Sequence, residues 1–242
     1  MGAFPVQTFF VPLPEESMFK DMFYQINPKK ARPGVVTMLS LAVGTDGTII
    51  WYDHWEDGYD ADVANKTSYS TEIWGDNDAS NGCAPDVTPC TDASDVLMAG
   101  STIVIQNTVV LPRDAAQFYY DGSDRIQASF PIALTRGAYP VAPGSLMAGA
   151  VEVLEVRSWG YNYEAPLGMD IGKYFQAFQF SAFFFMAAYD DTLVTLPDGS
   201  EITLHQGEAS MVRINQRDTL TANKLIQVDL ITGDVWSYYE LR

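Results

Sequence analysis

The sequence has little of several residue types on which function often depends. Among 242 residues there are two cysteines and two histidines, and 14 basic residues stand against 31 acidic ones. Two cysteines are too few to build a disulfide-based fold. A net charge of −17 repels nucleic acid and anionic membrane surfaces, so we expect no nucleic-acid partner. The same charge favours cations, basic partners and high solubility.

Long apolar runs and common catalytic motifs are also missing. The most apolar run, Phe178–Tyr189, is too short to span a bilayer, so we expect no membrane insertion. Residues 1–15 lack the basic start and apolar core of a signal peptide. There is no glycine-rich phosphate loop and no serine in a nucleophile elbow. We therefore expect a protein that is not an enzyme and needs no organic cofactor.

What is present predicts an all-β protein. Aromatic residues make up 13% of the chain, and runs of β-branched and aromatic residues alternate with Asp-Gly turns from Val35 onward. Thr45–Thr48 (TDGT) predicts a hairpin turn between two such runs. The exception is Pro14–Asn27, which predicts one short amphipathic helix.

That helix and the residues after it are candidates for assembly contacts. Its apolar face either covers a sheet or docks on a neighbouring subunit. The stretch that follows is the densest basic cluster of the chain. Together they give the assembly candidates Phe19, Phe23, Ile26, Lys29, Lys30 and Arg32.

Two halves of the sequence resemble each other. Leu39–Ile50 (LSLAVGTDGTII) resembles Phe183–Val194 (FFFMAAYDDTLV), and Asp124–Leu134 matches Asp218–Val228. Each half also has a strand led by glycine, at Gly100 and Gly207. We predict two related β-sandwich-like units, residues 1–165 and 166–242, of which the first carries the helix and a long acidic loop insertion at 56–99.

The chain is organised around an aromatic and acidic box that follows one predicted strand. One interpretation is a strand end whose rings pack while the acids face water. The others are a cation site, a sugar site with paired carboxylates, or a recognition edge for another protein. The recognition box comprises Trp51, Tyr52, Asp53, His54, Trp55, Glu56, Asp57, Gly58 and Tyr59.

The acidic loop offers the best metal candidates. Asp76–Gly82 (DNDASNG) resembles the start of an EF-hand loop, although its glycine falls one place late and no glutamate closes it. Cys83 and Cys90 are close enough to form a disulfide in an oxidising compartment, or to remain two thiols in a reducing one. The calcium candidates are Asp57, Asp60, Asp62, Asp76 and Asp78.

Several phrases together resemble one family: FFVPLPEE (9–16), GTIIWYDHWEDGYD (47–60), TEIWGD (71–76), YYDGSDRI (119–126) and LITGD (230–234). The chain is similar to the diatom pyrenoid shell (PyShell) proteins, within a group of β-rich algal and bacterial surface proteins that carry a "YYDHWEDGYE"-like box. The resemblance implies a non-enzymatic subunit that tiles into a sheet, tube or shell around Rubisco and the pyrenoid matrix, at the pyrenoid periphery in the plastid stroma. The alternative is an extracellular or bacterial cell-surface β-module that binds carbohydrate or calcium.

Overall fold

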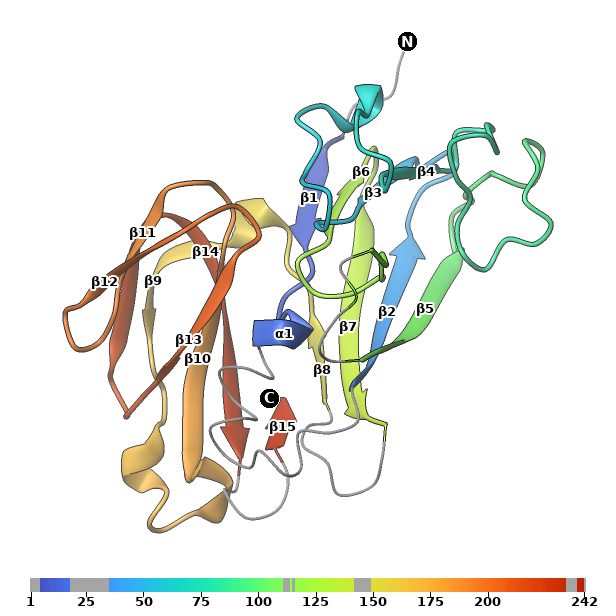
Figure 1. Ribbon diagram of the computed structural model, residues 1–242. Coiled ribbons are helices and arrows are strands. Elements are labelled where there is room, and N and C mark those ends of the chain that lie inside the picture. The colour runs from blue at the N-terminus through green and yellow to red at the C-terminus, as the bar shows by residue number, and fades with distance from the viewer. Residues whose placement is uncertain are drawn as a thin grey trace.

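The computed structural model describes residues 5–17, 35–110, 114, 116–141, 149–233 and 239–241, and it is all-β (Figure 1). The strands of these residues form three antiparallel sheets. Helical structure in them is limited to the short helix α1 (Glu15–Ser17) and four single turns of 3-10 helix. Those turns are η2 (Val63–Asn65), η3 (Val156–Ser158), η4 (Met169–Ile171) and η5 (Gln176–Phe178).

The first unit is a sandwich of two four-stranded sheets. The first sheet has the order β1 (Gln7–Phe10), β6 (Arg125–Ala128), β3 (Ile50–Asp53), β4 (Glu72–Trp74). The second sheet has the order β5 (Thr102–Val109), β2 (Val35–Val43), β7 (Ile132–Pro140), β8 (Gly149–Glu152). Alternate residues of each strand, such as Leu39, Leu41 and Ile126, meet in the core between the two sheets.

The second unit is one seven-stranded sheet that encloses its own core. Its spine is β14 (Thr219–Gly233), which pairs near its start with β9 and β11 and near its end with β10 and β15. Phe183, Phe185, Val194 and Leu204, which come from three strands, share one core. The other strands are β9 (Gly160–Glu164), β10 (Phe180–Ala187), β11 (Thr192–Thr195), β12 (Glu201–Leu204), β13 (Ala209–Arg213) and β15 (Tyr239–Leu241).

The strand pairings of the two units correspond one for one. The pairs β1–β6, β3–β4, β2–β5 and β7–β8 of the first unit have the counterparts β9–β14, β11–β12, β10–β13 and β14–β15. The main difference is a break at Pro131, before which β6 ends and after which β7 begins in the other sheet, whereas β14 runs through. Proline cannot donate to a ladder, which explains the break. The chain therefore consists of two related sheet units.

The hairpin predicted at Thr45–Thr48 is wrong. Gly47 has the positive φ of 70° that the turn requires. However, β2 already has β5 and β7 as neighbours, so β3 crosses to the other sheet and pairs there with β4 and β6. The turn is a corner of the sandwich and not a hairpin.

Some expectations lie partly or wholly outside the described residues. Only the first turn of the predicted helix, α1, is described, and the assembly candidates from Phe19 to Arg32 lie outside. The predicted division at residues 165/166 stays a prediction, although β9, which ends at Glu164, pairs with β14 of the third sheet. In the part of the chain that is described, no helix has the length and apolar character needed to cross a bilayer.

Candidate functional site

The recognition box lies at the end of β3 and in the loop that follows. Trp51 and Tyr52 are buried, which agrees with the packing interpretation. The expectation that its acids face water is wrong for Asp53, which is fully buried, and the same holds for the nearby Asp60. Buried carboxylates need partners, and the fold supplies them from distant segments.

Arg125 at the start of β6 neutralises this buried acid. Its guanidinium pairs with Asp53 and also donates to the backbone carbonyl of Asp60. Thr71 Oγ1 lies 2.8 Å from Asp53 Oδ1 and 2.7 Å from Asp60 Oδ2. Burial raises the pKa of Asp53, and Arg125 opposes that rise. Burial also raises the pKa of Asp60, but hydrogen bonds led by the Thr67 backbone outweigh it and lower that pKa.

A second buried cluster surrounds His54. Its Nδ1 lies 2.9 Å from the carbonyl oxygen of Tyr119, to which it donates, and 3.4 Å from Asp124 Oδ2. Tyr52 donates to the same Asp124 oxygen at 2.7 Å. Burial lowers the pKa of His54, but the negative charge of Asp124, followed by Glu56 and other acids, outweighs it and raises the pKa to about 9. His54 is therefore a buried cation at neutral pH.

This cluster also contains the one metal-like group among the described residues. Ligand atoms of His54, Glu56 and Asp124 lie within 4.8 Å of one another. The imidazolium of His54 already supplies a positive charge to these carboxylates, and its Nδ1 proton is directed to Tyr119. The arrangement is that of an internal ion cluster that fixes β3 against the turn at 121–124.

The calcium candidates of the acidic loop are not brought into that group. Asp57 accepts hydrogen bonds from Tyr69 and Ser70, and Asp60 from Thr67 and Ser68. Asp62 caps η2, Asp76 accepts from Asp78 and Asn81, and Asp78 accepts from Ser80. Asp carboxylates that accept hydrogen bonds from nearby backbone and hydroxyl groups are typical of loops. Cys83 and Cys90 are joined by a disulfide within the same loop. The calcium site stays a prediction.

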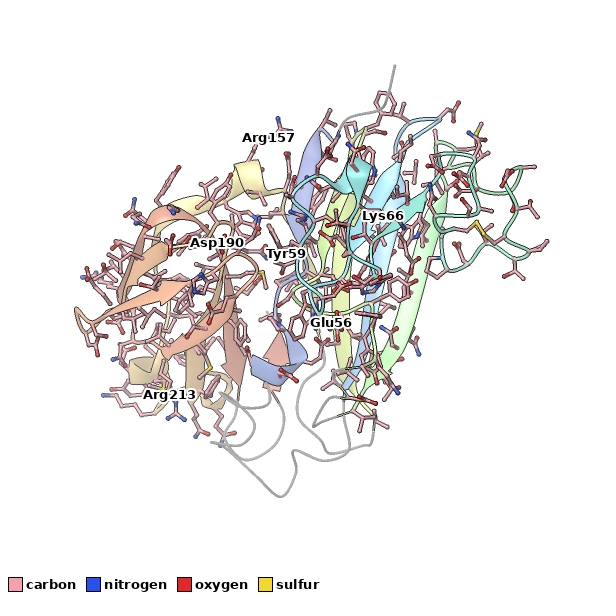
Figure 2. The ribbon with its side chains drawn as sticks, turned by 45° about the horizontal axis from the view of Figure 1, so that its top comes forward. Glu56, Tyr59, Lys66, Arg157, Asp190 and Arg213 are labelled. Carbon is pink, nitrogen blue, oxygen red and sulfur yellow. A yellow bond between two sulfur atoms is a disulfide. The ribbon has the colours of Figure 1, made fainter. Side chains whose placement is uncertain are left out.

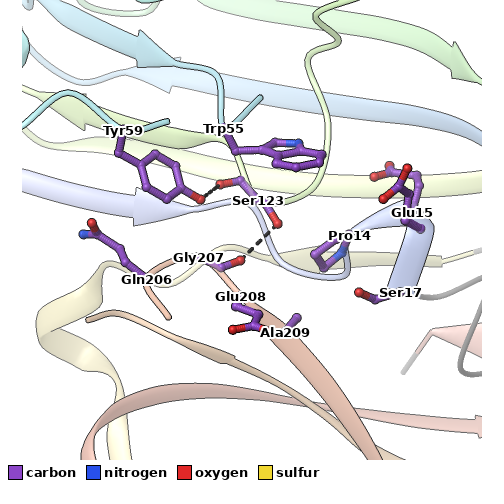
Figure 3. A pocket seen from close by; sticks show the side chains of 11 residues that line it. Pro14, Glu15, Ser17, Trp55, Tyr59, Ser123, Gln206, Gly207, Glu208 and Ala209 are labelled. Carbon is purple, nitrogen blue, oxygen red and sulfur yellow. Dashed lines mark hydrogen bonds between the residues drawn. The ribbon is translucent and has the colours of Figure 1, made fainter. Parts of the chain in front are cut away.

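The last residue of the box connects the two units. Tyr59 donates to the carbonyl oxygen of Ser123 at 2.7 Å, and Ser123 Oγ donates to the carbonyl of Gly207 at 3.0 Å (Figure 3). A Cβ at Gly207 would lie 1.8 Å from Tyr59 Oη, so glycine is required there. Figure 2 shows Tyr59 at the boundary between the units. Sequence reasoning found Gly207 as a repeat position but missed Ser123, Asp124 and Arg125 as partners of the box.

Beside this link is a cleft of about 270 Å³ (Figure 3). The first unit contributes Trp55 and Tyr59, the second contributes Gln206 and Glu208, and Glu16 of α1 completes the wall. An aromatic ring together with carboxylate and amide groups is typical of a site that binds a small polar ligand. In this cleft, Trp55 and Tyr59 of the box border an open cavity.

A different surface stands out by its lack of charge. It is the outer face of the second sheet, on the side opposite the core. By strand alternation it consists of Val36, Met38, Ser40 and Ala42 of β2, Thr102, Val104, Gln106 and Thr108 of β5, Ala133, Thr135, Gly137 and Tyr139 of β7, and Ala150 and Glu152 of β8. Glu152 is the single charged residue among them, and Val104 is 51% exposed.

No protein-family model, curated protein or solved structure matches this chain. The geometry and charge of its own residues therefore carry the functional argument.

Proposed function

We propose that the chain is a structural, self-assembling subunit of a protein sheet, tube or shell. The resemblance of its sequence to diatom pyrenoid shell proteins supports a place around the Rubisco-containing pyrenoid of an algal plastid. The observation that carries the proposal is the outer face of the second sheet, on which Glu152 is the single charged residue, on a protein whose net charge is −17.

Electrostatics explains why this face favours contact between copies. Identical subunits repel one another, and carboxylates brought together without partners would cost free energy on burial. From β5 across β2 to β7 the outer face avoids that cost, because its side chains there carry no charge. Exposed apolar side chains within it, Val104 and Tyr139, gain from being covered.

The box suits a structural role as well. Asp53, Arg125 and His54 are buried and hydrogen-bonded, so they hold loops in place and do not face a substrate. A rigid subunit is what a regular array requires.

Purified protein in negative-stain electron microscopy and light scattering tests the proposal. We expect sheets or tubes, and we expect Thr135→Asp, which adds a charge to the centre of the outer face, to abolish them. Thr221→Asp is the matched control, since Thr221 is also an exposed strand threonine, on β14 of the second unit. Monomers of the unaltered protein under all conditions would overturn the proposal, as would equal assembly of the two variants.

The cleft favours a second candidate function, which is carbohydrate binding at a cell surface. Trp55 offers a ring for stacking, and Gln206 and Glu208 offer hydrogen-bond partners for hydroxyl groups. Titration of soluble polysaccharides against tryptophan fluorescence tests it. A response that Trp55→Ala removes would support this function, and no response to any sugar would exclude it.

A further inference from the structure

The ends of the described sheets differ in how they are protected. A strand at the end of a sheet exposes unpaired backbone groups, and proteins blunt such edges by shortness, charge or proline. The strands β1, β4, β8 and β12 have three or four residues each. In contrast, β5 has eight residues, TIVIQNTV, with neither charge nor proline.

The second unit has an edge strand that corresponds to β5 but is better protected. The counterpart of β5 is β13, since β5 pairs with β2 as β13 pairs with β10. β13 has only five residues, ends in Arg213, and begins at the wall of the interunit cleft, where Ala209 lies. The same position of the fold is therefore blunted in one unit and left open in the other.

The hydrogen-bond pattern shows which backbone groups of β5 face outward. Gly100, with φ 87°, donates to the carbonyl of Val43, and Val43 donates to the carbonyl of Ser101, as in a G1 bulge. From this bonded pair, alternate residues of β5 bond to β2. The amide and carbonyl groups of Thr102, Val104, Gln106 and Thr108 consequently point to the open edge.

Nothing else in the described part of the chain occupies that edge. β2 is the only described strand paired with β5. The side chains of the four outward residues are exposed. Long, uncharged edge strands of this kind are templates for pairing with another chain.

We infer that β5 pairs antiparallel with β5 of a second copy of this chain, which joins two second sheets into one continuous sheet; this rests on the proposed self-assembly. The charge of the protein indicates which partner pairs with the open edge of β5. A basic partner would be drawn to the acidic loop instead, and nucleic acid is repelled by the net charge of −17. Another β5 is uncharged, has the same length and carries the same β-branched residues.

Strand geometry restricts the register. Residues opposite each other in an antiparallel pair point to the same side, so outer-face residues must meet outer-face residues. The numbers of any two residues that face each other must then add up to an even number. One residue therefore faces its own copy, and the two-fold axis passes between these two copies. Centring on Ile105 or on Gln106 overlaps nearly the whole strand. Either choice brings the two copies of Gln106 close together.

This contact also explains how a sheet could grow. A two-fold contact between identical edges closes on itself, so an extended array needs a second kind of contact. The joined sheets present an outer face of twice the width, uncharged over β5, β2 and β7 of each copy, and that face supplies the second contact. The two contacts can be separated by mutation.

The experiment is therefore sedimentation of the Thr135→Asp protein, in which the face contact is blocked. We expect a dimer. Adding Gln106→Pro should weaken that dimer at least tenfold, because the amide of Gln106 points outward and proline removes it without breaking a bond to β2. Gln106→Thr keeps the amide and is the matched control. The melting temperature of each variant shows whether it folds, and Gln106→Lys replaces the proline variant if that one does not.

A cysteine at position 106 reports the contact directly. The two native cysteines are joined to each other and no free cysteine is present among the described residues, so Gln106→Cys adds a unique thiol. We expect a short bis-maleimide to link it between copies in the Thr135→Asp background. A monomeric Thr135→Asp protein, or a dimer unaffected by both Gln106→Pro and Gln106→Lys, would overturn this inference and leave the proposed function standing. An unaltered protein that never assembles would instead overturn the proposed function.

Discussion

The buried cation at His54 should make the stability of the protein depend on pH in a defined window. The pKa of His54 is raised from 6.5 to about 9 in the folded state, because Asp124, Glu56 and Glu72 outweigh the opposing effect of burial. A group whose pKa rises on folding stabilises the protein fully below its unfolded pKa. That contribution is then lost as pH rises through the folded value.

The magnitude follows from the shift. At about 1.4 kcal/mol for each pKa unit, protonated His54 contributes about 3 kcal/mol at pH 6 and almost nothing at pH 9.5. His54→Gln removes the charge and keeps a polar side chain of similar length. The difference in unfolding free energy between the unaltered protein and His54→Gln should therefore fall by about 3 kcal/mol from pH 6 to pH 9.5.

Urea unfolding at a series of pH values measures this difference. The series ends at pH 9.5 because tyrosines of the unfolded chain ionise from about pH 10. His205→Gln is the control, since the His205 side chain is 69% exposed and its ion-pair partner is Asp190, which is also exposed. A difference that stays the same across the series would refute the assignment of a positive charge to His54.

Three further predictions follow from the loops and the net charge. Gly207→Ala should lower the free energy of unfolding in urea by about 2–4 kcal/mol, because the strain of a positive φ and a clash with Tyr59 add together. Gly199→Ala is the control and should cost about 1 kcal/mol, because Gly199 has a positive φ but lies in open space. Equal losses in the two variants would show that Tyr59 moves aside without cost. Millimolar calcium should raise the melting temperature if the acidic loop binds it, and Asp76→Asn with Asp78→Asn should remove that rise; no shift in the unaltered protein would retire the site. Assembly measured by light scattering should strengthen from ~10 mM to ~150 mM salt, because ions screen repulsion between subunits; a steady fall would contradict this.

The sequence predicted those features of the fold that depend on local pattern. Runs of β-branched and aromatic residues predict most of the strands, and the matching halves around Gly100 and Gly207 predict the paired units. The residues Thr45–Thr48 predict the turn itself, but the hairpin that they also predict is wrong. A turn sequence specifies the local bend, whereas the neighbours available to each strand decide whether the two strands pair.

The candidate site was harder to predict because its partners are distant in sequence. Asp53 looked like a water-facing acid, since nothing near it in the chain indicated that Arg125 would lie beside it. The uncharged face was hidden for a similar reason. Each strand shows its own alternation, but only the lateral order β5, β2, β7, β8 places Val104 and Thr135 on one surface.

The long strand β14 has a mechanical consequence. It is paired with β9, β10, β11 and β15 along most of its fifteen residues. A pull along this strand would load many of these bonds in shear at the same time, whereas β6 and β7 divide the same path between two sheets. Under tension in an array, the first unit should therefore yield before the second, and extension of single molecules should show two separate rupture events.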